Sequence, residues 1–171
     1  MSNPRIELKS LKLHDDMSEE TQCYSAIIVV DGVPAIRASN QGTGGSDEYN
    51  PVTHTPAGNQ AYDGAMAKLE AYVKTLPPIP SEYFPDGLEM DIELLVGNLI
   101  ETHRLKKDEK KFVKQLQQKI FMIDDGKLYT IKGEFSVAAH QRLLAKYPKA
   151  HILNALTADA AWAEAKPFLI G

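Results

Sequence analysis

Cysteine and aromatic residues are scarce in this chain: its 171 residues include one Cys, Cys23, and one Trp, and aromatic residues make up 8%. A lone cysteine cannot form an internal disulfide, which excludes a disulfide scaffold, and its apolar neighbours are typical of a buried, inert thiol. Apolar runs such as residues 26–30 are far too short to cross a bilayer, and the polar first residues lack the apolar core of a signal peptide. We therefore expect a protein of the cytoplasm that does not span a membrane.

Metal-binding patterns are missing from the sequence as well. The five histidines show neither HxH nor HExxH spacing and pair with no cysteine, so a zinc site is not expected. The acidic residues of segment 14–22 lack the oxygen-ligand spacing of a calcium loop, which favours a solvated loop. We expect no metal and no cofactor.

Composition and charge indicate an ordinary globular chain with one unusual segment. Hydrophobic residues make up 43% and charged residues 25%, and no shift in composition divides the sequence, so we expect one domain over residues 1–171. The net charge is −4, but segment 104–119 contains seven basic and two acidic residues, a local charge of +5 that leaves −9 for the rest. This segment predicts a basic surface that attracts an acidic partner, formed by Arg104, Lys107, Lys110, Lys111 and Lys114.

Nucleic acid is not the partner that this basic segment indicates. Its one aromatic residue, Phe112, falls on the apolar stripe that we expect to be buried, and the chain as a whole is acidic. A solvated helix face is the alternative interpretation.

Two β-hairpins are predicted by the sequence. Asp31-Gly32 and Asp125-Gly126 each lie between apolar runs, and Asp-Gly suits the positive φ angles that a type I′ turn requires. In the first hairpin the simplest register places Ile28 opposite Ala35, and Pro34 indicates an edge strand because it lacks an N–H. A preceding strand over residues 5–13 changes phase near Ser10, which predicts a β-bulge there.

Helical spacing of apolar residues follows each hairpin. It predicts an amphipathic helix over residues 61–76, a proline-rich connection, and further helical pattern between Met90 and Lys119, where one helix and two remain open. Ser136 and Thr157 are expected to cap two later helices. We predict an α+β fold, with an antiparallel sheet built from two β-hairpins and helices packed against it.

The most distinctive segment is the glycine loop, residues 40–47, with the sequence Asn-Gln-Gly-Thr-Gly-Gly-Ser-Asp. Its glycines allow positive φ and close approach of a ligand or another chain. Backbone N–H groups there resemble an anion-binding nest, but the Lys-Ser/Thr pair and immediate helix of a Walker A loop are absent. A long turn and a binding loop both remain open. The predicted ligand- or partner-binding residues are Asn40, Gly42, Gly44, Gly45, Asp47, Tyr49 and His54.

The residues of this loop support catalysis less strongly than they support binding. Asp47 and His54 form the minimum for general-base chemistry, in which a carboxylate orients an imidazole. No particular serine or threonine stands out as the nucleophile.

The first fifty residues carry a recognisable pattern: Ser18-Glu19-Glu20-Thr21, then the segment from Tyr24-Ser25-Ala26 to Asp31-Gly32, then Asn40 with Gly42, Gly44-Gly45 and Tyr49. This pattern resembles that of small uncharacterised proteins of phages and bacterial mobile elements. That group has no assigned activity, so no catalytic residue carries over. The resemblance implies a small accessory protein in the cytoplasm of a bacterial host, where binding and blocking a host component is a common role.

Two classes of function follow from these observations. The first is a non-enzymatic binding protein that inhibits or sequesters a host defence or regulatory component through the glycine loop, the edge near Pro34 or the basic segment. The second is an enzyme or sequestering module for a phosphorylated small molecule or nucleotide, with the glycine loop as its anion site. The expected partner is a host protein or a small signalling molecule, and a homo-oligomer remains open.

Overall fold

The computed structural model describes residues 3–170. Contacts within the chain group into two compact units, residues 1–102 and 103–171, whereas the sequence led us to expect one domain. The α+β class is confirmed, and so are both Asp-Gly hairpins, with positive φ at Asp31, Gly32, Asp125 and Gly126. The hairpins lie in two separate sheets, however, so the prediction of one shared sheet was wrong.

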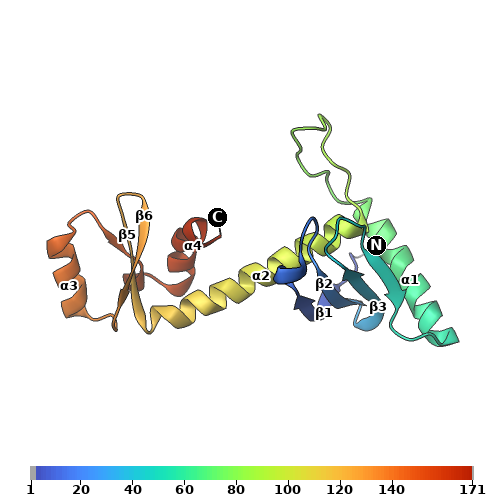
Figure 1. Ribbon diagram of the computed structural model, residues 1–171, viewed down its shortest axis with the longest axis horizontal. Coiled ribbons are helices and arrows are strands. Elements are labelled where there is room, and N and C mark those ends of the chain that lie inside the picture. Colours follow the sequence, from blue (N-terminus) through green and yellow to red (C-terminus); the bar gives the residue numbers. More distant parts are fainter. Residues whose placement is uncertain (1–2, 171) are drawn as a thin grey trace. The chain divides into compact units, whose positions relative to one another are not determined.

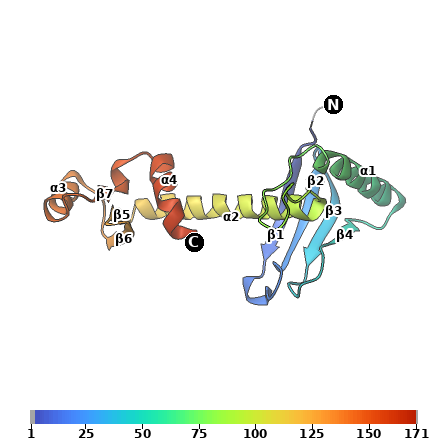
Figure 2. The ribbon, with the colours of Figure 1, turned by 90° about the horizontal axis from the view of Figure 1, so that it is seen from above.

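The first unit is a four-stranded antiparallel sheet with helix α1 (Pro56–Val73) on one face (Figure 1). Figure 2 shows its strands side by side in chain order, and they are β1 (Ile6–Leu13), β2 (Tyr24–Val30), β3 (Val33–Asn40) and β4 (Glu48–Pro51). The core between sheet and helix includes the fully buried Ile28, Ile36 and Leu69.

Two irregularities shape this sheet. Ser10 has a φ of 53° where the β1–β2 register shifts between Lys9 and Lys12, which confirms the predicted bulge. A second shift, between Ile28 and Val29, pairs Ile28 with Ile36 and not with Ala35, so the predicted register is wrong by one residue from that point. The shift places Ile36, Ala38 and Asn40 on the buried side, whereas the predicted register would have paired Ala26 with the exposed Arg37.

Strand β3 is internal, because β4 pairs with it from Ile36 to Ser39. The prediction that β3 is an edge strand was therefore wrong. Pro34 is tolerated because it lies beyond the residues of β3 that pair with β4.

A single helix, α2 (Ile92–Leu116), occupies the segment in which one helix and two remained open. Its N-terminal part contributes Leu95, Val96 and Ile100 to the core of the first unit. Among the described residues, none of the helices combines the length and the apolar character needed to cross a membrane.

The second unit contains a three-stranded antiparallel sheet of order β6-β5-β7. Its elements are β5 (Lys119–Asp124), β6 (Lys127–Lys132), α3 (Val137–Lys146), β7 (His151–Ile152) and α4 (Ala158–Leu169). Ser136 and Thr157 cap α3 and α4 as predicted. Alternate residues of β5 face two different clusters: Phe121 packs with Phe112 and Trp162, and Ile120 packs on the α3 side.

Candidate functional site

Asn40 organises the glycine loop from within. It is 5% exposed and is the buried polar residue of the described chain. Its Oδ1 accepts hydrogen bonds from the Gly42 N–H and the Thr21 hydroxyl, both at 2.8 Å. Its Nδ2 donates to the Gly45 carbonyl at 2.9 Å and to Asp47 Oδ1 at 3.0 Å. Both polar atoms of this side chain therefore connect parts of the loop.

The polar segment before β2 closes over the same loop. The Gly42 carbonyl accepts hydrogen bonds from the N–H groups of Glu19, Glu20 and Thr21 at 2.9, 3.0 and 3.3 Å. The Gly44 N–H donates to Thr21 Oγ1 at 3.2 Å. The two stretches that carry the sequence resemblance, residues 18–21 and the glycine loop, thus bind each other, and two amide donors of the predicted anion nest are already engaged.

The glycines of this loop have different structural roles. Gly42 is buried at a φ of 87°, and a Cβ there would overlap the Met17 carbonyl oxygen and lie 2.9 Å from the Cys23 Cβ. Gly44 has a φ of 88°, and a Cβ there would overlap the Glu20 carboxylate. A Cβ on Gly45 would meet open space. The requirement for glycine is therefore strict at position 42 and is set by the protein's own packing.

Asp47 is held by two tyrosines. Its Oδ2 accepts hydrogen bonds from the Tyr24 hydroxyl at 2.5 Å and from the Tyr49 hydroxyl at 2.9 Å. Burial raises the pKa of both phenols, and the hydrogen bonds and charge of Asp47 raise the pKa values further. Tyr62 of α1 donates to the Tyr49 carbonyl at 3.2 Å, which connects this cluster to the helix.

His54 lies apart from this network. It is exposed in the turn between β4 and α1, one residue before Thr55, whose side chain accepts from the Gly58 N–H and caps the helix. Within residues 3–170, the hydrogen bonds of the Asp47 carboxylate go to Asn40, Tyr24 and Tyr49, and His54 is not among their donors. The structure thus gathers Asn40, Gly42, Gly44, Gly45, Asp47 and Tyr49 but leaves out the predicted base.

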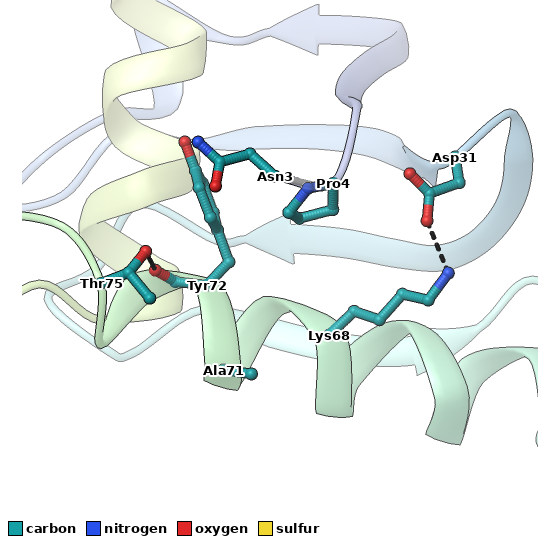
Figure 3. A pocket seen from close by; sticks show the side chains of 7 residues that line it. All are labelled: Asn3, Pro4, Asp31, Lys68, Ala71, Tyr72 and Thr75. Carbon is teal, nitrogen blue, oxygen red and sulfur yellow. Dashed lines mark hydrogen bonds and ion pairs between the residues drawn. The ribbon is translucent and has the colours of Figure 1, made fainter. Parts of the chain in front are cut away.

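A cavity of about 510 Å³ lies elsewhere in the first unit, between α1, the β2–β3 turn and the residues before β1 (Figure 3). Lys68 reaches from α1 to one end, where its Nζ lies 2.5 Å from Asp31 Oδ2, and Tyr72 stands with Asn3 at the other. Lys68, and secondly the Arg5 N–H, hold the pKa of Asp31 below its usual range. The lining residues are Asn3, Pro4, Asp31, Lys68, Ala71, Tyr72 and Thr75, none of them from the glycine loop.

The connection between α1 and α2, residues 77–90, is a loop with internal backbone hydrogen bonds that we call the tip loop. Ile79 and Leu88 form a β-bridge through two backbone hydrogen bonds of 2.9 and 2.8 Å. Inside the bridge, the Gly87 N–H donates to the Phe84 carbonyl at 2.9 Å, with Gly87 at a φ of 83°. In Figure 1 the tip loop extends away from the sheet and from α1.

The tip loop presents aromatic side chains to solvent. Tyr83 is 86% exposed and Phe84 53% exposed, and the neighbouring carboxylates of Glu82, Asp86 and Glu89 are exposed too. No Lys or Arg occurs between residues 75 and 103, so this surface is both aromatic and acidic. The sequence pattern predicted only a proline-rich connection here and not an exposed aromatic surface. The available signal was a Tyr-Phe pair between prolines, with no helical or alternating pattern to bury it.

The predicted basic surface lies on the part of α2 that belongs to the second unit. Lys107, Lys110, Lys111 and Lys114 are exposed there, and Arg104 is half-buried with an interaction partner. Among the described residues, these four lysines take part in none of the salt bridges.

Comparison with known proteins gives no relative: no protein-family model matches the chain, and neither a curated protein nor a solved structure is significantly similar to it. Within the described part of the chain, no three His, Cys, Asp or Glu side chains are grouped so that they would hold a metal ion.

Proposed function

We propose that this protein is a non-enzymatic binding protein whose recognition element is the tip loop. The observation that carries the proposal is the exposure of Tyr83, at 86%, and Phe84, at 53%, on a loop closed by its own backbone hydrogen bonds. Aromatic side chains dominate the energetics of protein interfaces, because each buries a large area while few torsions are fixed. Exposed aromatic pairs of this kind fit a protein partner.

The backbone hydrogen bonds of the tip loop support the same proposal. Binding costs free energy when a flexible segment must be fixed, and a loop already held in one conformation avoids much of this cost. The Ile79–Leu88 bridge and the Phe84–Gly87 turn fix the backbone on both sides of the aromatic pair. Recognition residues on loops that a rigid scaffold positions are common in binding proteins.

The glycine loop, where the sequence placed a candidate catalytic pair, uses its polar groups within the fold. Its Asn40, Asp47 and two of its amides are hydrogen-bonded within the protein, so a catalytic function would first have to break this network. Such a network stabilises the end of the sheet from which the loop leaves.

The resemblance of the first fifty residues supplies a biological context for the proposal. We propose that the protein acts in a bacterial host as a phage or mobile-element accessory factor, and that its partner is a host defence or regulatory protein that it inhibits or sequesters.

This proposal is tested by affinity capture from bacterial lysate with three baits. They are the wild-type protein, the double variant Tyr83→Ser/Phe84→Ser, and the control Tyr129→Ser, which removes a 43% exposed tyrosine from β6. We expect the double variant to retain at least about tenfold less of the partner than the wild type, and the control to retain it fully. Equal retention by the double variant would show that the tip loop is not the recognition element.

A second candidate function is the sequestering of a small molecule in the cavity beside Lys68. Its volume of about 510 Å³ lies within the range of ligand sites, and Tyr72, Ala71 and Pro4 give it apolar walls. Because Asp31 already neutralises Lys68, an amphipathic molecule suits this cavity better than a phosphate does. Thermal-shift screening of small molecules against the wild type and Tyr72→Ala tests this function; stabilisation that is equal in both proteins would exclude the cavity.

A further inference from the structure

We infer that, in the absence of another partner, the tip loop docks onto the lysine face of helix α2 in a second copy of this chain. The lysine face consists of Lys106, Lys107, Lys110, Lys111 and Lys114, all exposed. This inference goes beyond the proposed function, because it concerns the purified protein alone and needs no host component.

The tip loop and its surroundings are strongly acidic. Residues 75–103 contain six acidic residues and no Lys or Arg. Glu82, Asp86 and Glu89 are exposed beside the aromatic pair, and the salt bridges of the described residues do not include them. Lys74 lines one pocket together with Glu89, Asp91 and Glu93, but the acidic residues outnumber it, so this surface carries a concentrated negative charge.

Helix α2 carries the opposite charge. The positions 107, 110, 111 and 114 are spaced by three and four residues, so their side chains share one side of the helix. Asp108 and Glu109 are the acidic residues within segment 104–119, which keeps a local charge of +5. One chain thus presents two surfaces of opposite sign, and each copy can give its loop to one neighbour and its lysine face to another.

The chemistry of the two surfaces matches beyond net charge. Carboxylates of the tip loop pair with lysine ammonium groups, and an ammonium group also binds the face of an aromatic ring such as Tyr83 or Phe84. The methylene stems of lysine supply apolar surface against which these rings pack. Contacts of this kind between exposed groups are individually weak and are screened by salt, so the association is reversible and strongest at low ionic strength.

Sedimentation velocity of the purified protein over a range of concentrations tests the inference. At about 0.01 M salt, where the Debye length is about 30 Å, we expect the weight-average sedimentation coefficient to rise with protein concentration. At about 1 M salt, where the Debye length is about 3 Å, we expect this rise to disappear. A coefficient that does not depend on concentration at low salt would overturn the inference.

Charge reversal then identifies the surfaces. The acid-to-lysine variant is Glu82→Lys/Asp86→Lys/Glu89→Lys, and the lysine-to-acid variant is Lys107→Glu/Lys110→Glu/Lys111→Glu. Each variant alone presents two surfaces of like charge, so we expect its association constant to fall about tenfold or more. An equimolar mixture pairs opposite surfaces again and should restore association. Undiminished association of either variant alone, or a mixture that stays monomeric, would overturn the inference.

A matched control separates surface recognition from general attraction between charged proteins. Asp16→Lys/Glu48→Lys/Asp63→Lys changes three exposed acids outside the tip loop and gives the same net charge as the acid-to-lysine variant. We expect this control to self-associate like the wild type. The acid-to-lysine and lysine-to-acid variants also attract each other through their net charges. If they associate no more strongly than they do with a charge-matched protein that lacks both surfaces, the inference is overturned. Capture of a host partner is measured separately, so failure here leaves the proposed function standing.

Discussion

The two loops of the first unit, the glycine loop and the tip loop, use their residues in opposite ways. The glycine loop turns its polar groups inward: the Asn40 side chain and the Asp47 carboxylate bind other parts of the same unit. The tip loop is closed by the Ile79–Leu88 bridge and leaves Tyr83 and Phe84 in solvent. A chemically distinctive sequence can thus serve folding, whereas an apparent linker can carry exposed aromatic side chains, the surface that we propose for recognition.

The largest expected effect concerns Gly42. We predict that Gly42→Ala lowers the free energy of unfolding by about 2 to 5 kcal/mol, because alanine at a φ of 87° is strained and its Cβ overlaps the Met17 carbonyl. Gly45→Ala is the matched control, because its Cβ meets open space. Urea unfolding of both variants checks the prediction. If the two variants were equally stable, the glycine loop would not be the packed element described above.

The next effect concerns Asn40. We predict that Asn40→Ala lowers the free energy of unfolding by about 2 to 4 kcal/mol, since it removes four hydrogen bonds, among them those that Asn40 makes with the Gly42 N–H and with Asp47 Oδ1. Chemical denaturation measures the loss. A loss no greater than that of Thr43→Ala, at an exposed position of the same loop, would contradict the structural role of this side chain.

A smaller effect depends on pH and involves Tyr24, which is 4% exposed. Because burial and Asp47 raise its pKa in the folded protein, the folded state keeps a proton that the unfolded chain loses above about pH 10. Its stabilising contribution is therefore complete below pH 10 and falls by about 1.4 kcal/mol per pH unit above it. We predict that Tyr24→Phe, although less stable at neutral pH, shows a shallower loss of stability between about pH 9 and pH 11. An unchanged slope in urea unfolding would exclude this linkage.

The smallest effect on stability is expected in the tip loop. Tyr83→Ser and Phe84→Ser remove largely exposed side chains, so each should change the free energy of unfolding by less than about 0.5 kcal/mol. The same denaturation experiment compares them with Gly42→Ala. A loss above about 2 kcal/mol would mean that the aromatic pair is needed for folding, and the contrast between the two loops would not hold.

Local features of the fold were predictable, and non-local ones were not. The phase change near Ser10 and the two Asp-Gly turns act over a few residues, and each predicted element is present. The pairing of β2 residues 24–28 with β3 depends on a second bulge. The division into two sheets depends on which strands meet in space. Hydrophobic periodicity specifies which face of a strand is buried but not its partner strand.

The same distinction applies to the candidate site. The sequence predicted that Asn40, Asp47 and Tyr49 lie close together, and they do, because all three fall within ten residues of one another. It could not show that the Thr21 hydroxyl donates to Asn40 Oδ1, since that contact spans 19 residues. The sequence indicates the exposure of Tyr83 and Phe84 only indirectly, because no helical or alternating apolar pattern around them predicts that they are buried.

The central claim is that the tip loop, and not the glycine loop, recognises the partner. Site-specific photo-crosslinking in bacterial cells tests it most directly, with a photoreactive phenylalanine analogue placed either at position 83 or at the exposed position 43 of the glycine loop. We predict a covalent adduct with a host protein from position 83 and none from position 43. An adduct from position 43 in the absence of one from position 83 would contradict the claim.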